Sequence, residues 1–506
     1  MEFLTQGNLV LIKTKNKETT MNSKIIKALT MVLLVALIAF FTAPFVEAQE
    51  TKTITKGGKE FTYTPKLRPE GGPPATWTVT SNADAGANTL RWAISNSSDG
   101  DNIIFDILGS DVITLTTQET LFGGGWNSAF ALIGKSITIN GTNTNLASGN
   151  NITVQVSGTA TPSFRIFTVV TNNTLTLQNI ILKDGAPPSD DGGLMQLQDG
   201  HAILTNTTLS NGTGKVGGAI WCSTTLTIDN STISGNTATS NGGGIYLAGA
   251  GSGLTMTNST VSGNTCTQAG GGINAGGSTV IIQSSTIANN RCDDNDSQDD
   301  PAFPSGEPGG GLFTYLSGSL TIENTIIANN LNGTASPVGD DYYRHEGTLT
   351  DNGYNVVKIQ SETNPGAQFN NATDILYNTK ADGTTGYSTW NQGNTDLGNQ
   401  NLNLSTALTD NGTTKTGTLD ISAGSFAIGA GIYVAAADPD QIGTVRIDPP
   451  TIGAYEYISA AGVLITESGS TDVAEGGASP QDSYTVELTT APTAAVTVTV
   501  TPERST

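Results

Sequence analysis

The sequence predicts an all-β chain whose short strands coil into a parallel β-helix, and three observations lead to this fold class. Of the 506 residues, 61 are glycine and only 13% are charged, which is unlike a coiled coil or a helix-rich enzyme. Threonine, asparagine and serine are prominent, and these residues suit strands and turns better than helix interiors. In addition, one hydrophobic-polar phrase recurs about every 26 residues, as in a structural repeat.

The N-terminal region has the pattern of a secretory signal peptide that begins at Met21. Lys24 and Lys27 precede an apolar run from Met31 to Phe41, and a small-residue cleavage pattern ends at Ala48. The run is shorter than the ~20 residues of a membrane span, although an uncleaved anchor remains the alternative. We therefore expect a protein that is secreted or displayed on the cell surface after cleavage near Ala48, with no membrane span in the mature chain.

The chain is strongly acidic, which restricts its partners. It has 44 Asp and Glu against 22 Lys and Arg, a formal net charge of −22 at pH 7. Such a surface repels the phosphate backbone, so we expect no nucleic acid partner. Polysaccharide or cell-envelope components are the candidate partners, and the protein is expected to be a monomer.

The repeat units can be aligned on their first aliphatic residue. These residues are Leu175, Ala202, Leu226, Leu254, Val280 and Leu320, at intervals of 27, 24, 28, 26 and 40. The long interval contains the polar, proline-containing stretch from Cys292 to Pro308, which is typical of a loop inserted into a regular repeat.

Within a unit, apolar and polar residues alternate, as Leu226, Ile228, Asn230, Ile233 and Asn236 illustrate. Alternation with a period of two predicts short strands that turn one face inward. Equivalent residues of successive units should then form columns. Accordingly, Ile228, Met256, Ile282 and Ile322 are predicted to share one interior column.

A third strand follows two or three glycines in each unit, as in Gly242-Gly243-Gly244-Ile245. Glycine allows positive φ and the close approach of neighbouring backbones. Three short strands and three turns make one rung of a parallel β-helix. One rung cannot bury enough apolar surface to fold alone, so the rungs must stack.

Asparagine recurs at the first turn of the units. The residues are Asn206, Asn230, Asn258 and Asn324. Because stacked amides can hydrogen-bond along the axis, we interpret them as a structural ladder rather than a sugar-binding row.

Both ends of the repeat region are less regular. Ser136–Thr142 and Asn151–Gly158 are interpreted as degenerate rungs, and Trp77–Phe105 as a cap that covers the first edge. Beyond Asn330 the rungs are expected to become irregular through about Tyr457.

The predicted organisation has four parts. Residues 1–48 are an upstream extension and signal peptide, 49–76 a linker, 77–457 the capped β-helix, and 458–506 the start of a β-sandwich. The last part has too few strands for a complete sandwich.

The unit "LTIDNSTISGNTATSNGGGIY" resembles the rungs of bacterial exported right-handed parallel β-helix proteins of the pectate-lyase-like superfamily, and its Gly and Asn pattern is similar to repeats of polymorphic outer membrane proteins. Thr78–Ile107 resembles the cap of such solenoids, with Leu90–Ile94 as a short helix. The stretch up to Tyr457 resembles their end region. The resemblance implies a right-handed, single-stranded coil and an adhesin-like surface role.

The last 45 residues or so resemble the first half of a Calx-β domain, a calcium-binding β-sandwich in its best-known members. Glu475 in "VAEGG" matches the acidic position of that motif. Calcium takes six to eight oxygen ligands, and the other ligands cannot be assigned, so the metal site is left open.

The β-helix superfamily includes polysaccharide lyases and hydrolases, so an enzyme has to be considered. A lyase needs carboxylates for Ca²⁺ and a basic side chain, and a hydrolase needs a pair of carboxylates. Candidate groups are Asp184, Asp190, Asp191 and Asp199, with Lys183 and His201 near them, and Arg165 and Arg291 are among the few cations of the repeat region. No recognisable catalytic block surrounds them. We assign no catalytic residue and retain a polysaccharide lyase or glycoside hydrolase as the alternative.

A second acidic cluster lies in the inserted loop. It consists of Asp293, Asp294, Asp296, Asp299 and Asp300. The stretch lacks the glycine and terminal Glu of an EF-hand loop, so it is interpreted as a solvated acidic loop, with loose calcium binding as the alternative. Calcium is thus the one cofactor considered.

The chain has two histidines and three cysteines, which could in principle form catalytic, metal-binding or disulfide sites. His201 and His345 are far apart and have neither triad nor zinc spacing. Cys266 and Cys292 occupy equivalent places in adjacent units, so we predict that they face one another within range of a disulfide. Cys222 is expected to be a buried small side chain.

The sequence therefore favours a non-catalytic, adhesin-like scaffold that presents a flat surface to carbohydrate or envelope components. The sequence pattern shows no stripe of exposed aromatic residues that would mark a sugar-binding surface.

Overall fold

The computed structural model describes most of the chain between residues 72 and 458. The described residues are 2–6, 9–13, 51–56, 59–63, 72–119, 126–145, 151–292, 309–333, 338–339, 341–344, 346–357, 360–362, 369, 371–376, 402–410, 416–458, 463–467 and 484–488. The chain forms two compact units, Met1–Glu50 and Thr51–Thr506.

Three antiparallel hairpins lie outside the repeats. They are β1 (Glu2–Gln6) with β2 (Leu9–Lys13), β3 (Lys52–Lys56) with β4 (Lys59–Tyr63), and β40 (Val463–Glu467) with β41 (Tyr484–Leu488). The predicted signal peptide from Met21 to Ala48 and Glu475 lie outside the described residues.

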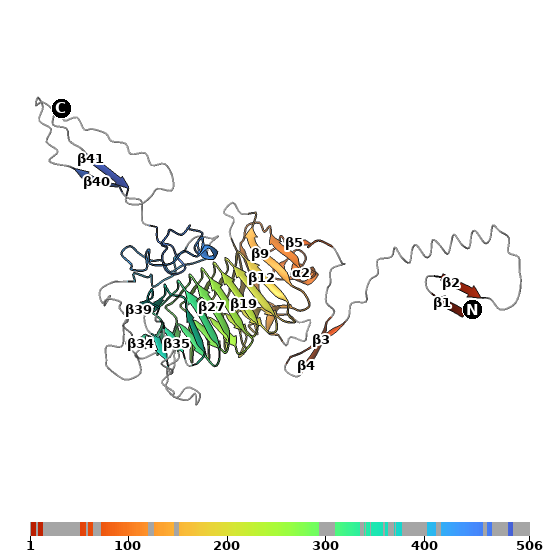
Figure 1. Ribbon diagram of the computed structural model, residues 1–506. Helices are drawn as coiled ribbons and strands as arrows, with labels where there is room; N and C mark the ends of the chain where they lie inside the picture. Colours follow the sequence, from red (N-terminus) through yellow and green to blue (C-terminus); the bar gives the residue numbers. More distant parts are fainter. Residues whose placement is uncertain are drawn as a thin grey trace, which may run out of the picture. The chain divides into compact units, whose positions relative to one another are not determined.

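The repeats build three long sheets in which every neighbouring pair of described strands is parallel. Figure 1 shows strands of successive rungs side by side along the stack. The first sheet contains β5 (Thr76–Val79), β6 (Asp101–Phe105), β9 (Ile137–Asn143), β12 (Thr174–Gln178), β15 (His201–Thr205), β19 (Thr225–Asp229), β23 (Gly253–Thr257), β27 (Thr279–Gln283), β31 (Ser319–Glu323) and β36 (Thr348–Asp351).

The second sheet follows the first in each rung. It contains β7 (Val112–Leu115), β10 (Ile152–Val156), β13 (Ile180–Lys183), β16 (Thr208–Ser210), β20 (Thr232–Ser234), β24 (Thr260–Ser262), β28 (Thr286–Ala288), β32 (Ile326–Ala328), β37 (Val356–Val357) and β39 (Ile375–Leu376).

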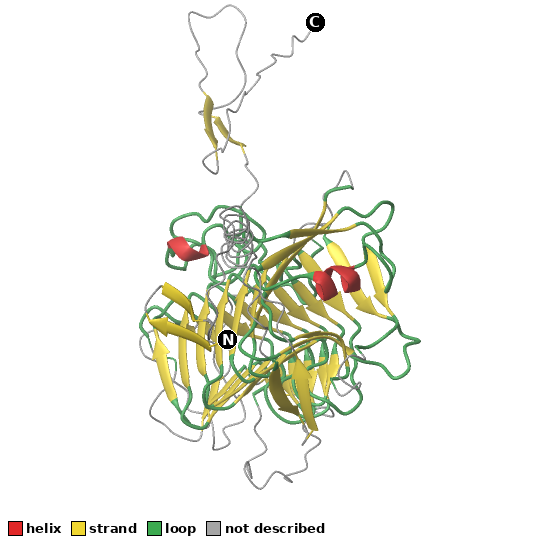
Figure 2. Cartoon of the chain, turned by 90° about the vertical axis from the view of Figure 1, so that its right-hand side faces the viewer, coloured by secondary structure: helices red, strands yellow, loops and turns green. Residues whose placement is uncertain are grey.

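The third sheet closes each rung. It contains β8 (Ser128–Leu132), β11 (Arg165–Val169), β14 (Met195–Leu197), β18 (Ile220–Cys222), β22 (Ile245–Ala248), β26 (Ile273–Gly276), β30 (Leu312–Tyr315), β35 (Tyr342–Arg344) and β38 (Gln360–Glu362). Strands make up the walls of the stack and loops connect them, as Figure 2 shows.

A fourth, short sheet was not expected from the sequence. This bridging sheet lies between the second and third sheets in chain order and contains β17 (Thr213–Gly214), β21 (Thr237–Ala238), β25 (Thr265–Cys266), β29 (Arg291–Cys292), β33 (Leu331–Asn332) and the antiparallel β34 (Val338–Gly339). The middle rungs therefore have four strands rather than three.

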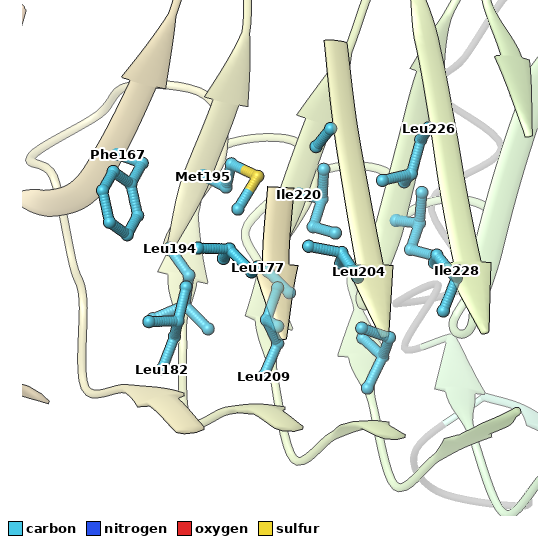
Figure 3. Close-up of a cluster of buried hydrophobic side chains, with 14 of the residues drawn as sticks. Phe167, Leu177, Leu182, Leu194, Met195, Leu204, Leu209, Ile220, Leu226 and Ile228 are labelled. Carbon is cyan, nitrogen blue, oxygen red and sulfur yellow. The ribbon is translucent and has the colours of Figure 1, made fainter. Parts of the chain in front are cut away.

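The predicted interior column is confirmed. Ile228 pairs with Met256, Met256 with Ile282, and Ile282 with Ile322, and each is at most 1% exposed. Figure 3 shows how equivalent aliphatic side chains of successive rungs fill the space between the sheets. The alternation of the sequence thus becomes a continuous apolar core, which stabilises rungs that could not fold singly.

The glycine motif is explained by the turn into the third sheet. Gly242 has φ +66°, which an L side chain rarely adopts. A Cβ on Gly243 would lie 2.2 Å from the carbonyl oxygen of Gly271 in the next rung. Neighbouring rungs can approach this closely only because the motif lacks side chains.

The N-terminal cap has the predicted helix, α2 (Leu90–Asn96). The Thr89 hydroxyl accepts the Trp92 backbone N–H at 3.2 Å, an N-cap bond that satisfies a free donor of the first turn. Leu90 and Ala93 are buried against the core, and Trp92 packs edge-on against Trp77 of β5. The two stretches interpreted as degenerate rungs, by contrast, are β9 and β10, consecutive strands of a single rung.

Residues 402–458, which we call the returning segment, do not continue the stack as irregular rungs. They fold back against the turn between the first and second sheets; Gln441 Nε2, for example, donates to the Thr232 hydroxyl at 2.8 Å. The 3-10 helix η1 (Ala435–Ala437) belongs to this segment. Pro439, Pro449 and Pro450 lack the N–H that a sheet ladder requires, which is one reason why the segment forms no further rung.

Among the described residues, no helix is long and apolar enough to cross a membrane.

Candidate functional site

The recurring asparagines fall into two columns at two corners of the rung. The first corner, between the first and second sheets, holds the predicted column, and Asn206, Asn230, Asn258 and Asn324 there have φ of 46° to 51°. Only part of it is a ladder. Asn206 Nδ2 donates to Asn179 Oδ1 at 2.7 Å, whereas Asn230 bonds to Asp229 and Asn258 donates to the Pro439 carbonyl of the returning segment.

The continuous ladder lies at the second corner, between the second sheet and the bridging sheet. Asn236, Asn264 and Asn290 each donate from Nδ2 to the Oδ1 of the next member at 2.9 Å, ending with Asn330. All four are fully buried. Asn330 in turn donates to a carboxylate oxygen of Asp341 at 2.9 Å. These amides are structural and unavailable to a ligand.

The first acidic cluster contains a buried arginine that is held by the fold. Arg165 is 0% exposed and lies 2.7 Å from an Asp190 carboxylate oxygen. Its other donors bond to the carbonyl oxygens of Trp126, Asp191 and Gly192. Because all these bonds hold the turn into the third sheet, Arg165 is a structural residue here rather than a free catalytic cation.

The two carboxylates of this cluster titrate differently. Burial raises the pKa of Asp190, but the hydrogen bond and charge of Arg165 lower it more, so the net pKa is below its usual value. The pKa of Asp191 is raised, first by burial and then by the charge of Asp190, while Lys215 and Arg165 oppose the rise. Among these candidate residues, Asp191, a half-buried carboxyl with a raised pKa, has the property most typical of a catalytic acid.

The other candidates do not join this cluster. Asp184 lies 4.0 Å from Lys183, Asp199 is exposed, and the His201 Nδ1 contacts the Thr225 hydroxyl at 2.7 Å. The five aspartates of the inserted loop and His345 lie outside the described residues. No group of three or more His, Cys, Asp or Glu side chains that could hold a metal ion occurs in the part of the chain that the structure describes.

The cysteines lie where the repeat predicts. Cys266 and Cys292 are paired across β25 and β29, their Sγ atoms are 2.9 Å apart, and both are buried thiols. A bridge between them stays a prediction. Cys222 is a buried small side chain as expected, and burial raises the pKa of its thiol to about 11, which makes it unreactive.

The returning segment is attached by buried charges. Arg446 donates to Asn258 Oδ1 at 3.0 Å and to the Gly453 carbonyl at 2.8 Å, and it lies 3.5 Å from Glu456. Both charged side chains are at most 4% exposed. Burial is the main cause that raises the pKa of Glu456, and Arg446 opposes it. This segment covers the first corner, so that corner is closed to ligands between the rungs of β19 and β31.

The outer face of the first sheet remains uncovered and is rich in threonine. Its central column contains Thr138, Thr176, Ile203, Thr227, Thr255, Ile281, Thr321 and Thr350. Ile203 and Ile281 are 39% and 42% exposed. The face therefore presents hydroxyl and methyl groups in a regular array.

Aromatic residues recur on the side of the third sheet that faces away from the core; Trp221 and Tyr246 are partly exposed, whereas Phe313 and Tyr343 are buried. On the outer face of the third sheet, Trp221 pairs with Tyr246, and Phe313 pairs with Tyr343 two rungs further on. In the sequence, Trp221, Tyr246 and Phe313 each follow directly after Ile220, Ile245 and Leu312, the first core residues of the third-sheet strands. This shared position after the glycine motif could have identified the row from the sequence. Asn274 interrupts the pattern in the rung between them.

Residues 126–359, less than half of the chain, match a family model described as a right handed beta helix region. No curated protein and no solved structure matches the chain. Together with the parallel sheets, the match defines the repeat region as a right-handed parallel β-helix.

Proposed function

We propose that the protein is an exported or cell-surface scaffold, adhesin-like in the broad sense, that binds carbohydrate or envelope components without transforming them. The observation that carries the proposal is the flat threonine-rich face of the first sheet, which is open over many rungs. A long regular surface of this kind suits extended polymers better than small substrates.

The charged groups also favour a scaffold over an enzyme. Arg165 and Arg446 are buried, and their donors are engaged by backbone carbonyls and ion pairs. Asp184 and Asp199 lie apart from the cluster or face solvent, and Asp190 is engaged by Arg165. Only Asp191 among these carboxylates also feels the charge of the exposed Lys215.

The sequence resemblance extends the proposal to location and composition. The signal-peptide pattern supports release or display after cleavage near Ala48, and the repeats resemble those of polymorphic outer membrane proteins and pectate-lyase-like solenoids. We propose a monomer without a nucleic acid partner, with a Calx-β-like module in its C-terminal region.

The test is retention without turnover by the full chain. The protein is incubated with neutral and acidic polysaccharides and with cell-wall preparations, and both bound protein and released sugar are measured. We expect retention by at least one polymer and no release of sugar. Failure to bind any preparation would refute binding as the function.

The alternative, a polysaccharide lyase or glycoside hydrolase, predicts the opposite result. It requires turnover that is lost in Asp191→Asn, because Asp191 is the half-buried acid of raised pKa. Asp199→Asn is the matched control, since Asp199 is an exposed carboxylate nearby in the sequence.

A further inference from the structure

The outward positions of the third sheet form one row across consecutive rungs. The row, which we call the aromatic row, contains Gln196, Trp221, Tyr246, Asn274, Phe313 and Tyr343. Their inward neighbours, such as Ile220 and Ile245, belong to the core. Neighbouring members are one strand spacing apart, ~4.8 Å, so the row runs along the axis of the stack.

Tyr315 adds a ring that lies across the sheet. It is paired with Gly276, where a Cβ would come within 2.2 Å of the Tyr315 Cζ, so the ring occupies the space that glycine leaves open. The hydroxyl oxygens of Tyr315 and Tyr246 are 3.4 Å apart. Trp221, Tyr246 and Tyr315 are each partly exposed and therefore accessible to a ligand.

The rings are held in place by others that are buried. Phe313 lies 5.3 Å from Tyr315 and 5.5 Å from Tyr343, centroid to centroid, and the latter pair is stacked. Phe313 and Tyr343 are each 1% exposed. An aromatic surface supported in this way loses little conformational entropy when a ligand binds.

Polar groups accompany the rings. The indole N–H of Trp221 forms no hydrogen bond with any described residue. Gln196 Oε1 and Asn274 Oδ1, on either side of the Trp221–Tyr246 pair, are buried and have no donor among the described residues. Unsatisfied buried acceptors are costly, so a small movement that admits a hydroxyl donor would be favourable.

We propose that the aromatic row, centred on Trp221, Tyr246 and Tyr315, binds an uncharged polysaccharide chain that lies along the axis. Aromatic rings stack on the C–H faces of pyranose rings, while indole and amide groups bond to hydroxyls. The row has no charged member, and the net charge of −22 disfavours an acidic glycan. One rung is also similar in height to one sugar of an extended chain. This inference rests on the proposed binding function, places the ligand on the third sheet rather than on the threonine-rich face of the first sheet, and assigns a ligand class.

Calorimetric titration of the full chain with cellohexaose, xylohexaose and chitohexaose tests the proposal, and a galacturonate hexamer serves as the acidic probe. We expect at least one neutral hexamer to bind. Trp221→Ala and Tyr246→Ala should weaken its binding about tenfold or more, as expected for central aromatic contacts.

Two further variants separate the site from general effects on folding. Gly276→Ala leaves every aromatic residue in the chain but displaces the Tyr315 ring, so it should also weaken binding. Tyr433→Ala removes a tyrosine that is 44% exposed on the returning segment, and binding should be unchanged. Circular dichroism and Tm establish that each variant is folded.

The outcomes distinguish the site from the function. Neutral hexamers that bind all variants equally would overturn the site while leaving the proposed function intact. Binding of the galacturonate hexamer alone would overturn the ligand class. If neither the hexamers nor any cell-wall preparation is retained, the site and the proposed function both fail.

Discussion

Two corners of the same solenoid carry asparagine at the same interval, but they are stabilised in different ways. At the second corner, the side chains of Asn236, Asn264, Asn290 and Asn330 hydrogen-bond to one another in a buried column. At the first corner, Asn258 bonds to a segment that lies 181 residues away in the sequence. The recurrence of asparagine at a repeat position therefore indicates a structural role for that position, but it does not predict which group the side chain hydrogen-bonds to.

The difference follows from how each corner is closed. The ladder amides of the second corner are buried and bond to backbone and side-chain groups of their own and the neighbouring rungs. The first corner turns outward with positive φ at each asparagine, and its polar groups become buried only when the returning segment covers them. The ladder of the second corner is thus closed within the stack, although Asn289 beside it also donates to the Ser405 and Thr406 carbonyls. The amides of the first corner depend more directly on long-range docking.

The largest expected effect comes from Arg446→Met, which separates the two corners most sharply. The change leaves Glu456 buried without its cation, which should cost about 3–5 kcal/mol and release the returning segment. Amide hydrogen exchange should rise in residues 416–458 and at the first corner, while the ladder at the second corner stays protected. The double variant Arg446→Met, Glu456→Gln should restore part of the protection; equal loss at both corners would contradict the comparison.

A change in the ladder of the second corner should be costly because of bonds that lie within the stack itself. Asn264→Ala removes acceptors for the N–H and Nδ2 of Asn236 and donors to Ile233 and Asn290, so we expect a loss of about 3 kcal/mol in the free energy of unfolding. Urea denaturation measures it. Asn206→Gly at the first corner, which keeps the positive φ, should cost less than about 1 kcal/mol; a similar cost for both would remove the distinction.

The third prediction concerns a local effect of pH at the last rungs of the first corner. There Thr325 donates to Asn355, and Asn355 donates to Asp374 at 2.9 Å. Burial, followed by the hydrogen bond and charge of Asp351, raises the pKa of Asp374 to about 8. Because the folded pKa is above the unfolded one, this contribution to stability is complete below about pH 4 and is lost as the pH rises towards 8.

Exchange protection of Val356–Val357 and Ile375–Leu376, corrected for intrinsic rates, should therefore fall between pH 5 and pH 8, approximately the interval set by these pKa values. Asp374→Asn should flatten this dependence, because the amide keeps the acceptor for Asn355 without the charge. The same slope in both proteins would show that another group is responsible.

Much of the fold could be predicted because the pattern is local. Alternation with a period of two sets which residues face inward, and equal spacing sets the register, so the column from Ile228 to Ile322 and the pairing of Cys266 with Cys292 were both predictable. The short bridging sheet was not, because two-residue strands leave too little alternation to recognise.

The remaining features depend on contacts that no local pattern encodes. Gln441 reaches Thr232 across 209 residues, and nothing in either stretch indicates the other. The aromatic row was overlooked for a different reason: Asn274 interrupts it, and Tyr315 joins it only because Gly276 lacks a side chain.

The ladder of the second corner has a direction. Every ladder amide donates to the side chain of the next rung towards the C-terminal end and also to a backbone carbonyl of the preceding rung. Asp341 closes the series with a group that only accepts when ionised. The replacement of an amide nitrogen by an oxygen thus ends the ladder at Asp341, while the three long sheets continue through β35 to β39. Copies of a middle unit could therefore be inserted before Asp341 to lengthen the ladder. A unit inserted after Asp341 would have no side-chain amide in the preceding rung to donate to it.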